Sequence, residues 1–507
     1  MRGKQGVFVW IIALILIFSV PAFAEEPASA EPPVRLRAVL IGCDHFLSQP
    51  DTWPAAETNL RLLSDTLSAD TRRYALIRAY SSSLSSPEAF EEAVLSSFQN
   101  AEARDISVLY ISTHGLFGEG ESTDQAALLL SDGEQEARLD AATLQRVLDQ
   151  IPGTKLVILD ACNAGAVIGK GVSGGAEHAY LTGPDYKVLC SAGGSEASWY
   201  FQGGTEPTVT GASYFATVLC SGLGLQGDFG ADLNADGQIT LTELYRFLRD
   251  NYAASTPQVY PQTDGDFPVL CYDPDLPRGI SKAITDITFE DTLLTAGESA
   301  VSFSFTVQRQ AELYYQIIYH QNGAWQFDQA QHFLDGEQAD GSILPGRKLR
   351  TLSLNTGNDA YGYAMIQLIT LENGSPVFQG ARLLCVRPSE GSVALHVETA
   401  PAFSPDALEE LSIFVQHNVP CGLTVSILNE AGKTVRRLAY EEPTRPQHLT
   451  PSGSSFFWDG RLASGETAPA GFYTVQVKTR LNGETFLAES APFELKRTEL
   501  ILLPNKK

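Results

Sequence analysis

The sequence predicts an α/β domain with a mostly parallel sheet flanked by helices, followed by two all-β sandwich domains. Between residues 35 and 278, short apolar runs alternate with helical stretches, which is typical of parallel strands joined by helices. After residue 278 the helical periodicity stops, and alternating apolar and polar residues, as in 301–306, indicate half-buried strands. The length of 507 residues fits about three domains, at roughly 100–200 residues each.

The α/β region divides into five expected strands and five expected helices. The strands are residues 37–42, 75–79, 106–112, 155–160 and 187–191. The helices are residues 55–67, 87–100, 140–150, 212–221 and 240–250. In a sheet built this way, ligands bind outside the carboxyl ends of the strands, so residues that directly follow a strand are the first candidates for chemistry.

The β-rich remainder breaks at a Pro/Gly/Ser stretch near residues 387–391, which gives domains at 279–388 and 389–497 and a tail at 498–507. The last domain contains a hairpin, a Trp458-Asp459-Gly460 turn and a Pro-Ala-Gly-Phe-Tyr strand entry ending at Tyr473. These features resemble the Ig-like domain of flagellar hook-capping proteins, a module also appended to secreted bacterial enzymes. We expect Trp458 and Tyr473 to be core aromatics.

The composition excludes several classes of protein. The formal charge of −25 and the pI near 4.7 oppose binding to nucleic acid or anionic membranes, because both need a basic surface. Seven cysteines spread along the chain form neither a disulfide framework nor a zinc ribbon. We expect no organic cofactor.

The first 24 residues predict export. A basic start, an apolar run over residues 7–20 and Pro-Ala-Phe-Ala before Glu25 are typical of a cleaved signal peptide. The alternative is an uncleaved anchor, since residues 7–24 are only just long enough to span a membrane. Residues 25–34 read as a flexible linker. We expect a secreted or periplasmic chain without membrane insertion after cleavage.

The candidate catalytic residues directly follow two neighbouring strands. His114 and Gly115 come after the strand at 106–112, and Asp160 and Cys162 lie at the end of the strand at 155–160. Both ends belong to one edge of a parallel sheet, so these residues converge on one crevice. A thiol needs a neighbouring imidazole to raise its thiolate fraction, and the imidazole then protonates the leaving amine.

The Ser-Thr-His-Gly and Asp-Ala-Cys-Asn-Ala-Gly motifs resemble those of the caspase-like cysteine peptidases, most closely the metacaspase-like and other bacterial members. The resemblance covers about residues 35–262. It implies that Cys162 is the nucleophile and His114 the general base and acid. It also implies that the N–H groups of Cys162 and Gly115 form an oxyanion hole. The chain departs from the metacaspase pattern at Asn163-Ala164, where that family usually has His-Ser.

The resemblance also implies a substrate class. In the metacaspase-like branch the acid two residues before the cysteine lines the S1 pocket, so Asp160 is expected to bind Arg or Lys at P1 by a charge-assisted pair. Asp44 is a candidate second acid in that pocket, with a solvated or turn-capping role as the alternative. His45 is expected beside the cleft, and His178 has no assigned role.

Residues 165–184 form a long Gly-rich loop directly after the nucleophile. Relatives often cut themselves after a basic residue here, which makes Lys170 the candidate self-processing site. The alternative is a plain flexible lid, since loops of this length are usually functional or mobile.

A calcium-binding pattern lies within the α/β domain. Residues 232–243 match the twelve-residue EF-hand loop, with Gly237 at the sharp turn. The ligands expected in this loop are Asp232, Asn234, Asp236, Gln238 through its carbonyl, and Glu243. The same residues also suit a turn and helix cap without metal, so Ca2+ is one of two alternatives.

Two functions remain open at this stage. The first is an exported cysteine endopeptidase that cleaves protein or peptide substrates after Arg or Lys, and that is self-processing and calcium-dependent if both site predictions hold. The second is a catalytically silent caspase-like binding or assembly protein of the cell envelope, whose β-sandwich domains bind an envelope or surface partner. A narrower rival is an amidase or transpeptidase that uses the same thiol.

Overall fold

The computed structural model describes residues 34–497, apart from the short segments that follow. These segments are 51–54, 119, 175–178, 202–210, 253, 263, 276–278, 298–299, 322–323, 328–331, 355–360, 373–374, 408 and 448. The predicted signal peptide, most of the linker, His178 and the tail at 498–507 lie outside the described residues. From Arg35 onward the chain groups into one compact unit.

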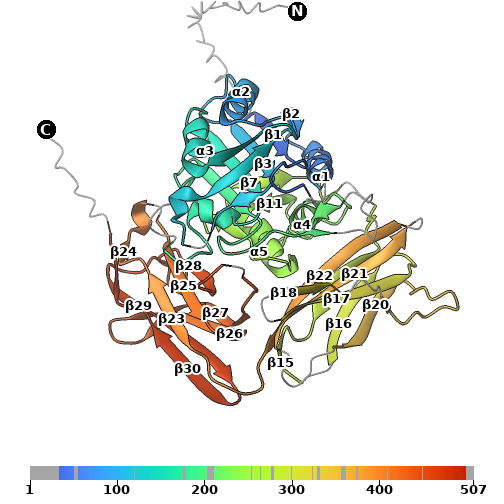
Figure 1. Cartoon of the computed structure of the whole chain (residues 1–507), viewed down its shortest axis with the longest axis vertical. Helices are drawn as coiled ribbons and strands as arrows, with labels where there is room; N and C mark the ends of the chain where they lie inside the picture. Colours follow the sequence, from blue (N-terminus) through green and yellow to red (C-terminus); the bar gives the residue numbers. More distant parts are fainter. Residues whose placement is uncertain are drawn as a thin grey trace, which may run out of the picture. The chain divides into compact units, whose positions relative to one another are not determined.

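A six-stranded sheet forms the centre of the first domain (Figure 1). Its strand order is β12-β8-β7-β3-β1-β2. All neighbouring strands run parallel except β12, which is antiparallel to β8. The strands are β1 (Leu36–Gly42), β2 (Tyr74–Ser81), β3 (Ile106–Ser112), β7 (Thr154–Asp160), β8 (Tyr186–Cys190) and β12 (Gln258–Tyr260). The predicted mostly parallel sheet is confirmed.

Helices cover both faces of this sheet. Residues that alternate along each strand point to opposite faces, and two apolar cores follow from that alternation. One core joins Leu40 and Tyr110 of the sheet to α1 (Ala56–Ser68), α4 (Tyr214–Gly222) and α5 (Leu241–Asn251). The other joins Ile41 and Ile111 to α2 (Pro87–Ser97) and α3 (Ala141–Leu148). All five predicted helices are present, and each begins within two residues of its expected start.

A small antiparallel sheet follows His114 and was not predicted. It consists of β4 (Gly115–Leu116), β5 (Ala127–Ser131) and β6 (Glu136–Asp140), in the order β4-β5-β6. Its strands are two to five residues long, too short for a clear alternation signal. This small sheet fixes the main chain on the carboxyl side of β3.

In the described residues after 278, the regular structure is β strand apart from a short 3-10 helix at Pro405–Ala407, as predicted. The middle region pairs the sheet β14-β16-β20 with a sheet in the order β15-β22-β21-β17-β18. Alternating burial along β16 (Ala300–Val307) confirms the half-buried strand expected there. The other strands of the middle region are β14 (Ile284–Phe289), β15 (Leu293–Thr295), β17 (Leu313–Gln321), β18 (Ala324–Phe327), β19 (His332–Phe333), β20 (Gly346–Ser353), β21 (Gly362–Glu372) and β22 (Ser375–Arg387).

The last region is built on the predicted hairpin, β26 (Gly422–Asn429) with β27 (Thr434–Pro443). Trp458 and Tyr473 are buried in its core, and their rings lie 5.2 Å apart. The other strands are β23 (Leu395–Thr399), β24 (Ala402–Phe403), β25 (Leu411–His417), β28 (Gly453–Trp458), β29 (Gly471–Leu481), β30 (Glu484–Glu489) and β31 (Phe493–Leu495). Within the part of the chain that the structure describes, no helix has the length and apolar character needed to cross a bilayer.

Candidate active site

The two predicted catalytic strand ends meet. In the β3–β7 pair, Ser112 is opposite Asp160, and the N–H of Thr113 donates to the carbonyl of Asp160 at 3.2 Å. His114 and Cys162 each follow that pair by two residues, at corresponding positions. The main chain of Gly115 lies against Cys162 so closely that a Cβ at position 115 would be 1.6 Å from the Cys162 carbonyl oxygen.

The half-buried thiol of Cys162 is held by Ser198. The N–H of Ser198 donates to Sγ at 3.4 Å, and Sγ lies 3.7 Å from the Ser198 carbonyl. Burial raises the pKa of this thiol, and the carboxylate of Asp160 raises it further, while the Ser198 N–H acts to lower it. The thiol form is therefore favoured at neutral pH, and attack requires a base to take its proton.

Asn163 shapes the turn after the nucleophile. Its backbone is left-handed, with φ of 58°, a conformation that Asn adopts more readily than most residues. Its side-chain N–H donates to the carbonyl of Gly194 at 2.7 Å, and its main-chain N–H donates to the carbonyl of Glu196 at 2.8 Å. The departure from the metacaspase motif at this position thus has a structural role here.

His114 is half-buried and contacts Phe46. The two ring centroids are 4.4 Å apart, with the planes tilted by 59°. Burial lowers the pKa of the imidazole, and the negative charge of Glu136 opposes that effect. The carbonyl of His114 accepts a hydrogen bond from Leu129 of β5 at 2.9 Å. A neutral imidazole in a fixed frame is suited to act as a general base.

Asp160 is buried in a shell of hydroxyl groups. Its carboxylate accepts hydrogen bonds from Tyr110 at 2.9 Å, from Ser198 at 3.1 Å and from Ser213. Burial raises the pKa of this carboxyl, and the hydroxyl donors act to lower it. Ser198 thus connects Asp160 to Cys162. Asp160 is 3% exposed, so any group that binds its carboxylate has to displace a hydroxyl to reach it.

Asp44 caps the start of α1, and its role as a second substrate-binding acid stays a prediction. Its carboxylate accepts from the N–H groups of Ala55 and Ala56 at 2.7 Å and of Glu57 at 3.0 Å. These donors are the free backbone groups at the start of α1. Among the described residues, the donors to this carboxylate belong to the helix end, and the residue is 8% exposed. These contacts fit the turn-capping alternative.

Lys170 is buried rather than presented on an open loop. Its ammonium group lies 2.6 Å from a carboxylate oxygen of Glu410, 2.6 Å from the carbonyl of Val259 and 4.1 Å from the ring centroid of Phe457. The Lys170 side chain is 5% exposed and that of Glu410 is 9% exposed. In this arrangement Lys170 is closed to a protease, so processing there requires prior separation of Lys170 from Glu410.

The EF-hand-like loop is closed by its own backbone. Asp232 accepts hydrogen bonds from the N–H groups of Ala235 at 2.7 Å and Gly237 at 3.0 Å, and from the Tyr272 hydroxyl at 2.8 Å. Glu243 forms a capping box with Thr240 at the start of α5. The remaining expected ligands are Asn234 and Asp236, which bond within the loop, and Gln238.

Within the described residues, no group of three or more His, Cys, Asp or Glu side chains is placed so that it could hold a metal ion. The contacts of residues 232–243 fit the turn and helix cap without metal better than a formed calcium site. We therefore derive no catalytic step through Ca2+, and calcium binding stays a prediction.

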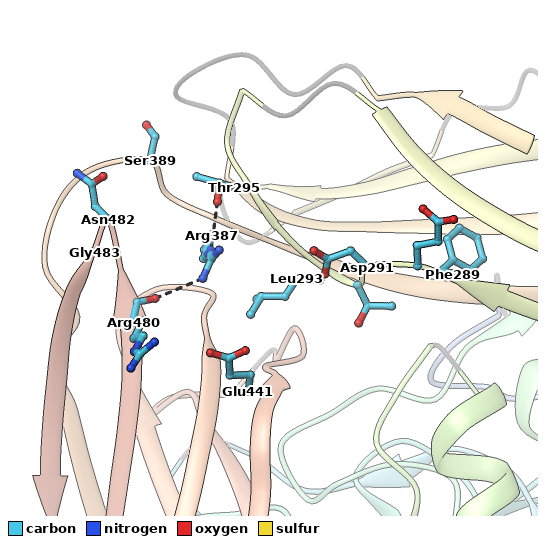
Figure 2. Close-up of a pocket in the computed structure, with 12 residues that line it drawn as sticks. Phe289, Asp291, Leu293, Thr295, Arg387, Ser389, Glu441, Arg480, Asn482 and Gly483 are labelled. Carbon is cyan, nitrogen blue, oxygen red and sulfur yellow. Dashed lines mark hydrogen bonds between the residues drawn. The ribbon is translucent and has the colours of Figure 1, made fainter.

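A cavity of about 590 Å³ lies away from the predicted site residues, among strands of the two all-β regions (Figure 2). Arg387 is one of the residues that line it (Figure 2). Its guanidinium donates to the hydroxyl of Thr295 at 3.2 Å and to the carbonyl of Arg480 at 3.4 Å. Glu441 and Asp291 also line this space (Figure 2). None of the residues that line this cavity is one of the predicted site residues, so it has no part in the chemistry of Cys162.

Several residues that complete the site were not predicted from the sequence. Tyr110, Ser198 and Ser213 bond the Asp160 carboxylate, and Phe46 contacts His114. Hydroxyl and aromatic residues are common in any sheet, so their types alone carry no signal.

Two parts of the chain match known domain families. Residues 12–184 match the CHAT domain, which has a caspase-like fold, and residues 415–483 match the FlgD Ig-like domain. The first match includes His114, Gly115, Asp160 and Cys162. Both resemblances predicted from the sequence are confirmed, and a CHAT domain suggests a cysteine peptidase. No curated protein matches the chain.

Two solved structures are among those similar to the chain. Caspase-1 from Spodoptera frugiperda is 15% identical and covers 45% of this chain and 88% of its own, with a TM-score of 0.29. Protein GSU0716 from Geobacter sulfurreducens is 12% identical and covers 47% of this chain and 100% of its own, with a TM-score of 0.34.

Proposed function

We propose that the chain is a cysteine endopeptidase with Cys162 as nucleophile and His114 as general base and acid. The observation that carries this proposal is the contact of Gly115 with the Cys162 main chain, where a Cβ would lie 1.6 Å from the carbonyl oxygen. That contact brings the residue next to the imidazole against the residue that bears the thiol. A silent binding protein has no need for such a close approach.

The chemistry begins from a neutral pair, because burial raises the pKa of Cys162 and lowers that of His114. His114 takes the thiol proton as Sγ attacks the scissile carbonyl carbon. The N–H groups of Gly115 and Cys162 stabilise the oxyanion. The protonated imidazole then gives its proton to the leaving amine, and the thioester forms. Water, deprotonated by His114, hydrolyses the thioester and restores the thiol.

We assign Asp160 to selection of Arg or Lys at P1. A buried carboxylate favours a cation that enters beside it, since charge-assisted hydrogen bonds are about twice as strong as neutral ones. Ser198 donates both to Asp160 and, through its N–H, to Cys162. A substrate that reaches Asp160 replaces the Ser198 hydroxyl and so is positioned next to the thiol.

Export to the periplasm or the outside of the cell belongs to the same proposal, and it depends on residues 1–24, which lie outside the described residues. The β regions are proposed to bind an envelope or surface partner that places the peptidase near its substrates.

The test is hydrolysis of fluorogenic peptides with Arg, Lys or Asp at P1 by the chain that begins at Glu25. We expect cleavage after Arg or Lys, lost by at least 1000-fold in Cys162→Ala, on the order of the loss when a catalytic nucleophile is removed. Asp160→Asn should reduce kcat/KM for basic P1 while the folded fraction is retained. Cleavage after Asp alone would refute the role of Asp160, and no cleavage by the wild-type chain would favour the binding or assembly protein.

A further inference from the structure

The loop after β1 is attached to the small sheet that follows His114. The carboxylate of Glu136, at the start of β6, accepts hydrogen bonds from the N–H of Leu47 and from the N–H of Ser48 at 3.1 and 3.2 Å. On the other side of Phe46, the hydroxyl of Ser131 donates to the carbonyl of His45. The loop is therefore anchored on both sides of Phe46.

Phe46 is the point at which this loop reaches the site. Its side chain is 6% exposed and packs with Cys43, Leu129 and Leu116. Its ring lies 4.4 Å from the His114 imidazole. The aromatic ring thus forms one wall of the space that holds the imidazole, and the anchors of the loop fix the place of that wall.

We infer that Glu136 is a positioning residue for His114, because its carboxylate holds the backbone of residues 47–48 and thereby keeps Phe46 against the imidazole. The inference rests on the proposed role of His114 as the base. Both Leu47 and Ser48 are exposed, so their N–H groups have water as the alternative partner, and the carboxylate is what orders them. Glu136 contributes in this way without touching the substrate.

The chemistry explains why such a wall matters. His114 has to accept a proton from Sγ and then donate it to the leaving amine, and both steps need the imidazole in one orientation. A rotation that displaces the reacting nitrogen by about 1 Å can cost on the order of 100-fold in rate. The negative charge of Glu136 also supports the imidazole as a proton acceptor, because it opposes the lowering of the imidazole pKa by burial.

Four variants test the inference through kcat and KM on a basic-P1 peptide. Glu136→Gln keeps an oxygen for the two N–H groups, so we expect kcat within about threefold of wild type. Glu136→Ala and Phe46→Ala should each lower kcat by about 10- to 100-fold, with little change in KM. The double variant should be no slower than the slower single variant, because both changes remove one contact. Glu134→Gln, an exposed position in the same hairpin, is the matched control.

A second measurement does not need peptidase activity. The alkylation rate of Cys162 by iodoacetamide at pH 8 is followed by mass spectrometry of its peptide, with His114→Ala as the reference for a thiol without its base. We expect Glu136→Ala to approach that reference and Glu136→Gln to stay near wild type. Thermal unfolding checks that each variant is folded, and Phe46→Leu replaces Phe46→Ala if the latter unfolds.

Three results would overturn the inference. They are equal kinetics of Glu136→Ala and Glu134→Gln, equal losses in Glu136→Gln and Glu136→Ala, and fully additive losses in the double variant. A wild-type chain without hydrolysis, or with alkylation that does not depend on His114, counts instead against the proposed peptidase. The two failures are therefore distinguishable.

Discussion

Gly115 leaves no room for a side chain beside Cys162, since a Cβ there would lie 1.6 Å from the Cys162 carbonyl oxygen and 2.7 Å from the carbonyl carbon. The obstacle is backbone, which cannot rotate away as a flexible side chain does. Any residue larger than glycine therefore separates the two strand ends that bring His114 and Cys162 together.

Gly115→Ala should lower kcat by about 100-fold or more, as expected when reacting groups move by about 1 Å. It should also lower the free energy of unfolding by about 1–3 kcal/mol, as for an overpacked site. Peptide hydrolysis and denaturant unfolding measure the two effects. Gly265→Ala is the control, because nothing lies within 4 Å of a Cβ at that position. Normal activity in Gly115→Ala would show that the two strand ends need not approach this closely.

The pH dependence of hydrolysis and of alkylation should show that Cys162 and His114 are a neutral thiol and a neutral imidazole at pH 7. The pKa of His114 lies below its ordinary value of 6.5, so the imidazole is a free base at pH 7 and kcat/KM should fall only below pH 6.5. The pKa of Cys162 lies above 9.0, so alkylation of the free enzyme should rise through and beyond pH 9. Peptide hydrolysis as a function of pH tests the first direction, and iodoacetamide rates between pH 5 and 10 test the second. A flat, fast plateau from pH 5 to 8 would instead reveal a thiolate–imidazolium pair.

The order of strands and helices in the α/β region was predictable because its segments carry strong local patterns. The strand at Ile106–Ser112 lies where the sequence places it, and α2 begins at the predicted Pro87. Buried parallel strands are continuous apolar runs, and Pro at the first helical turn is a start signal. The candidate residues His114 and Cys162 were chosen for the same reason, since each directly follows such a run.

Residues whose roles depend on distant partners were not predictable. Lys170 reads as a loop residue, but its partner Glu410 lies 240 positions away. Asp44 reads as an acid after a strand, and its role as a cap appears only when the start of α1 folds back onto it. Glu136 lies in a hairpin too short to show a pattern. In each case the deciding contact is tertiary, and no local propensity encodes it.

The Lys170–Glu410 pair should contribute to stability and protect the chain after the nucleophile. Glu410→Gln leaves a buried ammonium group without its countercharge, so we expect a loss of about 3–5 kcal/mol in the free energy of unfolding. Cleavage by trypsin after Lys170 should become faster, because the loop that carries Lys170 opens more often. Glu430→Gln, in an exposed turn of the same region, is the control. Unchanged trypsin resistance in Glu410→Gln would show that other contacts protect this loop.

The EF-hand-like loop should be stable without calcium, because Asp232 already satisfies the N–H groups of Ala235 and Gly237 and the hydroxyl of Tyr272. Asp232→Ala leaves these three donors without that partner. We expect it to lower the free energy of unfolding by about 1–3 kcal/mol, equally in chelator and in millimolar Ca2+. Chemical denaturation in both conditions measures this. A wild-type chain stabilised by Ca2+, with the gain lost in Asp232→Ala, would instead establish residues 232–243 as a metal site that forms on binding.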